Sequence, residues 1–131
     1  MLFRSPAPGQ GALAVECRDD DPLADELAVL DDARSRAAVE AERAVLATLE
    51  GGCSAPIGAL AEVVEGEDGD ELWVRAIALS PDGGLSVRMS LTGDPADAIG
   101  VGVRLATEMV ADGAGQLGQP GPAADDADKV R

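Results

Sequence analysis

Two cysteines carry the most reactive side chains of this sequence, and no histidine is present to assist them. Cys53 lies in the segment Gly51-Gly52-Cys53-Ser54-Ala55-Pro56, and Cys17 lies well before it. A thiolate is a soft nucleophile, able to form a lasting thioether with an electrophilic carbon. Without histidine, the usual general base and the commonest metal ligand are both missing, so two thiols alone cannot make a zinc site.

The surroundings of Cys53 favour a permanent attachment point over a recycling nucleophile. A helix is expected to end just before Cys53, and the partial negative charge of a helix C-terminus disfavours a thiolate. Gly51 and Gly52 leave space beside the sulfur, and Ser54 is expected to hydrogen-bond the turn. The residues alone also allow a simpler interpretation, in which Cys53 is a small buried thiol in a glycine-rich turn.

The other polar motifs carry less chemistry. Cys17 alternates with Val15 on an expected strand, which favours a buried structural thiol. A Cys17–Cys53 disulfide is not expected, because no secretory signal is visible and the thiols of a cytoplasmic protein stay reduced. A redox role is disfavoured because no Cys-x-x-Cys motif occurs. The acidic clusters 19–21 and 65–71 lack the ligand spacing of a calcium loop.

Composition narrows the possible partners. The 131 residues include 25 acidic and 10 basic side chains, and the net charge of −15 would repel nucleic acid and anionic lipid. Phe3 and Trp73 are the only aromatic residues, so a base-stacking platform is excluded as well. No apolar run reaches the length of a membrane span. The core is therefore expected to consist of Ala, Val, Leu and Ile.

The element pattern predicts a small α+β domain. Residues 12–18 resemble a short strand, a helix is expected to start near Asp21, and a second helix is expected over about 32–50. Alternating residues then predict strands over 57–65, 71–80 and 85–92, joined as an antiparallel meander. The final helix is expected from Asp94 to about Asp112.

The same pattern predicts which residues of three elements face the core. Helical spacing predicts an apolar stripe on the second helix and a sheet-facing row on the last one, and period-two alternation predicts the buried row of the central strand. Glu42 and Arg43 are expected to form a surface or interdomain ion pair. In chain order the three rows are Ala38, Ala41, Val45 and Leu49; Leu72, Val74, Ala76 and Ala78; and Ile99, Val103, Ala106 and Val110.

The expected fold is thus a small three-stranded antiparallel sheet covered by helices, preceded by an orphan strand that belongs to a domain outside this chain. Residues 1–31 are interpreted as a remnant of that preceding domain, and 32–112 as the domain carrying Cys53. The Gly-, Pro-, Ala- and Asp-rich residues 113–131 are expected to form a disordered tail.

Two motifs resemble one enzyme family. The segment from Pro8 to Arg18, PGQGALAVECR, resembles the stretch by which porphobilinogen deaminases (hydroxymethylbilane synthases) return from their second domain to their first. The motif Ala41-Glu42-Arg43-Ala44, followed by LEGGCSAPIG from Leu49 to Gly58, is similar to that family's cofactor-attachment signature. Both occur in the order of the family, and the resemblance covers about residues 6–112.

The resemblance implies a cytoplasmic, monomeric transferase of tetrapyrrole (haem) biosynthesis. Members of the family join four porphobilinogen units into hydroxymethylbilane on a dipyrromethane primer, which a thioether holds to the signature cysteine. Here that residue would be Cys53, with Gly52 and Ser54 beside the cofactor. Gln10 would either enter the family's cleft or serve as a plain turn residue.

The chain is expected to lack the part of the family that carries the catalytic aspartate and the carboxylate-binding arginines. No catalytic residue and no metal ligand is therefore expected in it, and it would bind porphobilinogen or the pyrrole chain only together with those N-terminal domains. The alternative is a non-catalytic structural or interaction domain that keeps the fold of the family without its cofactor.

Overall fold

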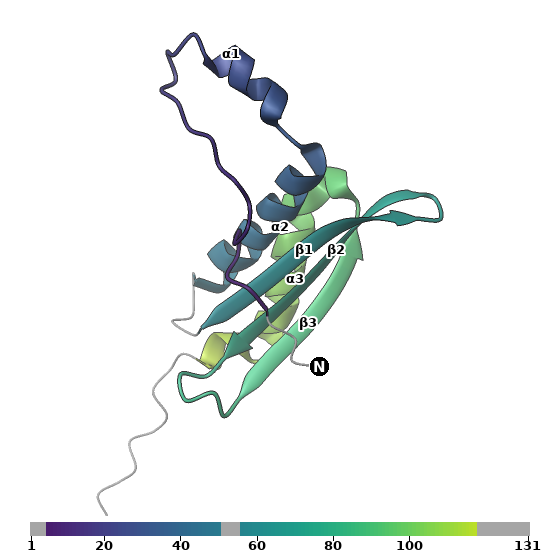
Figure 1. Cartoon of the computed structure of the whole chain (residues 1–131). Helices are drawn as coiled ribbons and strands as arrows, with labels where there is room; N and C mark the ends of the chain where they lie inside the picture. Colours follow the sequence, from purple (N-terminus) through teal and green to yellow (C-terminus); the bar gives the residue numbers. More distant parts are fainter. Residues whose placement is uncertain (1–4, 51–55, 118–131) are drawn as a thin grey trace, which may run out of the picture.

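The computed structural model describes residues 5–50 and 56–117 (Figure 1). It is an α+β fold in which a sheet carries helices on one face, as the sequence predicts. The elements, in chain order, are α1 (Ala24–Leu27), η1 (Ala28–Leu30), α2 (Ala33–Glu50), β1 (Ile57–Gly66), β2 (Gly69–Leu79), β3 (Ser86–Gly93), η2 (Pro95–Asp97), α3 (Ala98–Ala111) and η3 (Ala114–Gln116).

The three strands form an antiparallel meander in the order β1-β2-β3, which confirms the expected topology. Gly66 pairs with Gly69, so the first hairpin turns through two residues, and Gly69 has a positive φ of 132°. The second turn is closed by Ser80, whose Oγ accepts a hydrogen bond from the Leu85 N–H at 2.9 Å. Hydrogen bonds from Ser80 and the Gly84 N–H lower the pKa of the Asp82 carboxyl.

The core lies between one face of the sheet and the helices α2 and α3. The expected alternation on β2 is confirmed, because Leu72, Val74, Ala76 and Ala78 are all buried. The stripe on α2 is also confirmed: Ala41, Val45 and Leu49 are buried, and Ala38 packs against them partly exposed. Small side chains dominate this core, so the helices lie close to the sheet and to each other.

The buried face of α3 differs from the expected one. Ile99, Val103 and Val110 are exposed, and only Ala106 of the predicted row is buried. The helix is apolar almost all round, so helical spacing fits two faces equally well. The buried face consists of Ala98, Val101, Gly102, Leu105, Ala106 and Met109.

Gly102 explains why this face of α3 is the buried one. A Cβ atom at this position would overlap the Ala41 carbonyl oxygen and lie 2.8 Å from the Ala44 Cβ. Only glycine therefore permits the close packing of α3 on α2, and this contact decides which side of α3 is buried.

Residues 12–31 form an arm that projects from the domain (Figure 1). As expected of the orphan segment, residues 12–18 pair with no strand of the described chain, and Leu13 and Val15 are 98% and 61% exposed. The helix expected near Asp21 is reduced to α1 and η1, neither of which has a buried residue. Asp21 does hydrogen-bond the helix start, because its carboxylate accepts from the Leu23 N–H at 3.0 Å.

The domain continues past the expected start of the tail. Gly113 adopts a positive φ of 102° after α3, η3 follows, Ala114 is fully buried and Leu117 packs against the core. Residues 113–117 are therefore ordered, contrary to prediction. The rest of the expected tail, 118–131, lies outside the described residues.

Candidate functional site

The segment that carries the predicted attachment residues connects α2 to β1. Gly52, Cys53 and Ser54 lie outside the described residues, so their interactions stay predictions. On one side of this segment α2 ends at Glu50, and on the other β1 starts at Ile57. The C-terminal end of α2 and the N-terminal end of β1 lie at the same end of the domain in Figure 1.

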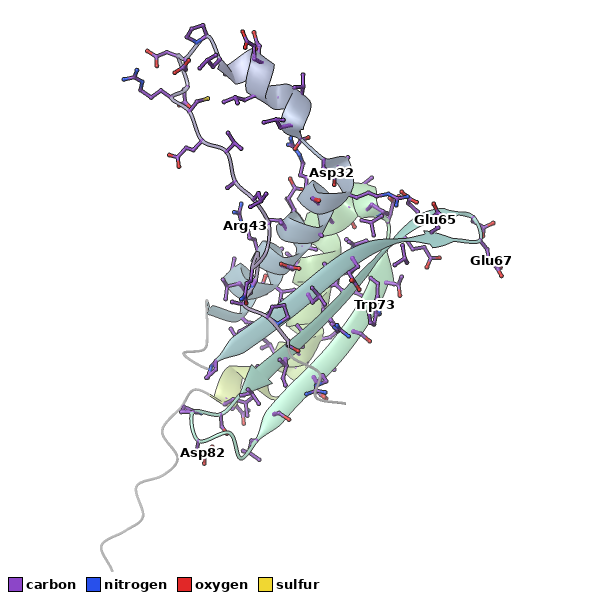
Figure 2. The ribbon with its side chains drawn as sticks, in the orientation of Figure 1. Asp32, Arg43, Glu65, Glu67, Trp73 and Asp82 are labelled. Carbon is purple, nitrogen blue, oxygen red and sulfur yellow. The ribbon has the colours of Figure 1, made fainter. Side chains whose placement is uncertain are left out.

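The first turn of α2 is fixed by polar contacts. The Asp32 carboxylate accepts a hydrogen bond from the Ser35 N–H at 2.7 Å, and hydrogen bonds from the side chain and backbone of Ser35 lower its pKa below the usual 3.8. Arg34 binds Asp70 with Nη2 and Oδ1 2.7 Å apart, which ties α2 to the β1–β2 hairpin. Figure 2 shows Asp32 at the start of this helix and Arg43 farther along it.

Glu42 is the buried charged residue that sequence reasoning placed wrongly. Its side chain is not paired with Arg43 at the surface: Glu42 is only 5% exposed, and Arg43 is exposed. One carboxylate oxygen, Oε2, accepts from the Gly9 N–H at 2.5 Å, and the other, Oε1, accepts from the Ala61 N–H at 2.8 Å. Glu42 thereby connects the N-terminal loop, the helix α2 and the strand β1.

The same contact completes the free edge of the sheet. β1 is an edge strand, and its outward N–H groups need partners. The Ala59 N–H donates to the Pro6 carbonyl at 3.0 Å, and the next outward N–H, that of Ala61, donates to Glu42. A Cβ at Gly58 would lie 2.8 Å from the Ser5 Cβ, so glycine is required where the N-terminal segment crosses β1.

Gln10 closes a turn in the described structure. Its N–H donates to the Ala7 carbonyl at 3.0 Å, and its Oε1 accepts from the Ala7 N–H at 3.2 Å. Gly9 and Gly11 on either side have positive φ angles of 76° and 93°. These contacts account for Gln10 as a turn residue, and any role toward a cofactor stays a prediction.

Cys17 is not the buried thiol that the sequence predicts. It lies on the projecting arm as a free, exposed cysteine. The expected burial assumed a strand with neighbours, and residues 12–18 have no such neighbours in the described chain. Cys17 therefore contributes nothing to the packing of the core.

Residues 5–50 and 56–117 contain neither a membrane-spanning helix nor a cluster of metal ligands. No helix there is long and apolar enough to cross a membrane. Nor do those residues bring three or more His, Cys, Asp or Glu side chains together as a metal site.

The chain is similar in sequence to known proteins of one family. Residues 36–111 match the family model described as the C-terminal domain of porphobilinogen deaminase. The porphobilinogen deaminase of Nocardia farcinica is 55% identical over 118 residues, covering 86% of this chain and 34% of that protein. Those of Acidothermus cellulolyticus (52% over 117 residues, 86% and 34% covered) and Mycobacterium avium (53% over 118, 86% and 38% covered) are similar.

The chain spans about a third of the length of these curated relatives. The matched region contains the whole sheet together with most of α2 and all of α3. The chain therefore belongs to the porphobilinogen deaminase family, and residues 36–111 are the C-terminal domain of that family.

Proposed function

We propose that this chain is the cofactor-carrying part of a hydroxymethylbilane synthase, with Cys53 as the anchor of a dipyrromethane primer. The supporting observation is the Glu42 carboxylate, which joins two sequence motifs that are far apart in the chain. Gly9 belongs to the first family-like motif and Glu42 to the second. Such a junction holds the Pro8–Gly11 loop beside the helix that leads to Cys53.

Attachment is a single addition. The Cys53 sulfur would bond to the electrophilic methylene carbon of an azafulvene-type pyrrole, and the thiol proton would pass to the pyrrole nitrogen, so no group would leave. When bound, the dipyrromethane supplies the primer for chain growth. Gly51 and Gly52 have no side chains that would compete with the pyrrole rings, and the segment runs from the end of α2 to the start of β1.

Turnover is proposed to need more than this chain. A polycarboxylate pyrrole chain requires cationic side chains, and three described arginines already pair with acids: Arg34 with Asp70, Arg36 with Asp31, and Arg104 with Asp97. The catalytic aspartate and the arginines that hold acetate and propionate groups would come from the N-terminal domains of the family. Porphobilinogen would bind only in their presence, and a cytoplasmic location stays a prediction.

Intact mass spectrometry tests the anchor. The chain is co-expressed with the N-terminal domains of the Nocardia farcinica relative, purified, and weighed. We expect a dipyrromethane adduct on the parent, its loss in Cys53→Ser, and its retention in the matched control Cys17→Ser. Peptide mapping then places the adduct.

An unmodified Cys53 in a complex that forms, together with absent deaminase activity, would contradict the anchor. That result would favour the alternative function, a non-catalytic structural or interaction domain of the same family.

A further inference from the structure

The strand β3 has no neighbouring strand on its outer side. The sheet order is β1-β2-β3, so β3 is an edge strand within the part of the chain that the structure describes. The Leu79 N–H donates to the Pro56 carbonyl at 3.0 Å, so the odd-numbered residues of β2 bond to β1 and the even-numbered ones bond to β3. In the β2–β3 register, the backbone groups that point outward are those of Ser86, Arg88, Ser90 and Thr92.

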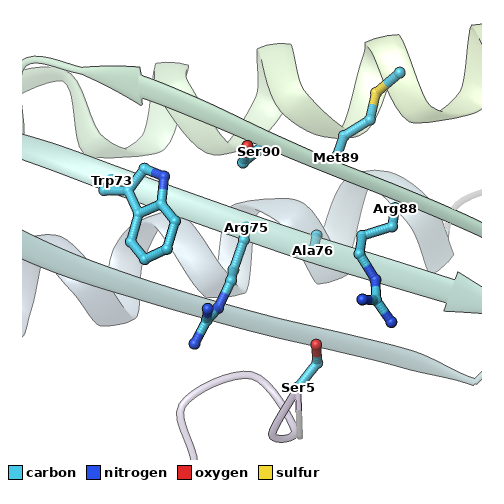
Figure 3. Close-up of a pocket in the computed structure, with 7 residues that line it drawn as sticks. All are labelled: Ser5, Trp73, Arg75, Ala76, Arg88, Met89 and Ser90. Atoms are coloured by element: carbon cyan, nitrogen blue, oxygen red, sulfur yellow. The ribbon is translucent and has the colours of Figure 1, made fainter. Parts of the chain in front are cut away.

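The side chains of β3 form an apolar row and a polar row. Val87, Met89 and Leu91 are half-buried and pack against the core, whereas Arg88 is exposed. Figure 3 shows Met89 and Arg88 leaving the strand on opposite sides. The strand contains no proline and no charge on its core side, and these are features by which natural edge strands avoid pairing. β3 is therefore able to accept a further strand.

Residues 12–18 of the projecting arm have the pattern of such a strand. All of them are exposed, and they contain neither a helix nor a turn. Leu13, Val15 and Cys17 alternate with Ala14 and Glu16, so an extended backbone would place the apolar residues on one side and the acid on the other. The polarity of the two sides matches that of β3.

We propose that the arm of one copy of this chain adds a fourth strand to the sheet of a second copy, antiparallel to β3. In this arrangement Glu16 stands opposite Arg88, so that a carboxylate and a guanidinium meet on the open face of the sheet. The same register extends the apolar row on the helix-covered face. Its opposed pairs are Leu13 with Leu91, Val15 with Met89, and Cys17 with Val87.

The partner is a second copy because the arm cannot reach its own β3 in this register. Gly9 is held outside β1, since its N–H donates to the Glu42 carboxylate, which also accepts from the Ala61 N–H of that strand. The outer side of β3 is about four strand spacings away, or ~19 Å. The chain from Gly9 to Leu13 spans about 14 Å at most.

A cross-strand disulfide tests the register. Every protein in this experiment carries Cys53→Ser, so that Cys17 is the one native thiol left. Position 87 and Cys17 of the second copy would form a non-hydrogen-bonded pair with a Cα separation of about 4.5 Å, which a disulfide can bridge. Val87→Cys should therefore give an intermolecular disulfide between positions 17 and 87 on mild oxidation, identified by peptide mapping. The matched control Val64→Cys, exposed on β1, should not pair with Cys17.

An exchange of charges tests the opposed pair. Sedimentation equilibrium gives the dissociation constant for self-association of the Cys53→Ser chain. Glu16→Arg should raise this constant about tenfold, because two cations then stand opposite each other. Adding Arg88→Glu to the same chain should restore it. Glu26→Arg makes the same change of charge at an exposed residue of α1 and should have no effect.

Three results would overturn the proposal. The first is the mass of a single chain at millimolar concentration, which would leave the arm to the N-terminal domains of the family. The second is an equal yield of disulfide to Cys17 from Val87→Cys and Val64→Cys. The third is a double variant that folds, as judged by circular dichroism, but associates no better than Glu16→Arg. None of these measurements depends on Cys53 or on deaminase activity.

Discussion

At the scale of single residues, Glu42 is the side chain on which most of the site depends. A buried carboxylate is stable only when its oxygens receive hydrogen bonds, and here two backbone N–H groups supply them. Those donors come from Gly9 and Ala61, which are distant in the sequence and belong to different parts of the fold. The edge of β1 has no neighbouring strand at Ala61, and the Glu42 carboxylate supplies the hydrogen-bond acceptor that such a strand would provide.

Glu42→Gln should destabilise the domain by about 1–3 kcal/mol, because an amide can accept from only one of the two N–H groups and directs its own NH₂ at the other. Urea unfolding followed by Trp73 fluorescence measures the change. The control Glu108→Gln alters an exposed residue of α3 and should stay within about 0.5 kcal/mol of the parent. Equal midpoints for the two variants would show that the Glu42 contacts carry no stability.

The sequence does indicate that Glu42 is buried, although the expected ion pair with Arg43 placed it at the surface. Positions 38, 42, 45 and 49 follow helical spacing, so Glu42 lies on the apolar stripe of α2 and not on its solvent side. A charged residue on a buried stripe requires a polar partner, but sequence alone does not identify two backbone amides as that partner. Cys17 could not be placed either, because its burial depends on neighbours that the described chain does not contain.

At the scale of elements, the strands were predictable and the orientation of α3 was not. Period-two alternation and turn residues mark each strand, and both signals are local in the sequence. α3 has apolar residues on nearly every side, so helical spacing is compatible with two different buried faces. The polar positions Arg104, Thr107 and Glu108 mark its solvent side better than the apolar ones mark its core side.

Gly102→Ala should cost about 1–3 kcal/mol, because the added methyl meets the backbone oxygen of Ala41 and the helices must separate. The gain of about 1 kcal/mol in helix propensity does not offset that clash. Thermal unfolding of the variant and the parent measures the difference.

Gly100→Ala is the matched control on the same helix. The atoms nearest to its methyl would be those of the movable Asp97 carboxylate, whose exposed pair with Arg104 is worth about 0–1 kcal/mol. The propensity gain and the weakened pair nearly cancel, so the control should remain close to the parent. A Gly102→Ala variant as stable as Gly100→Ala would contradict the packing explanation.

At the scale of the whole molecule, the arm over residues 12–31 contrasts with the packed domain. Its apolar side chains Leu13, Val29 and Leu30 are 98%, 81% and 62% exposed. Exposed apolar residues on a segment with few internal contacts are typical of a surface that another domain covers. This agrees with the proposal that the chain acts together with the N-terminal domains of its family.

Limited trypsin digestion should cut first after Arg18 among the described residues, because the protease needs an exposed segment that can open locally. Mass spectrometry of the early products identifies the site, and Arg18→Gln should delay the first cut. Adding the N-terminal domains of a relative should protect Arg18. An earlier cut at Arg43 within α2 would indicate that the domain itself opens more easily than the arm.

The N-terminal segment that crosses β1 makes the folded unit discontinuous in sequence. Residues 5–9 belong to it through Pro6, Gly9 and Glu42, although the projecting arm separates them from α2. A boundary drawn at residue 36, where the family match begins, cuts through this unit. A shortened chain starting there would leave the Ala59 amide without the Pro6 carbonyl and the Glu42 carboxylate without the Gly9 amide, and two such copies could then pair edge to edge.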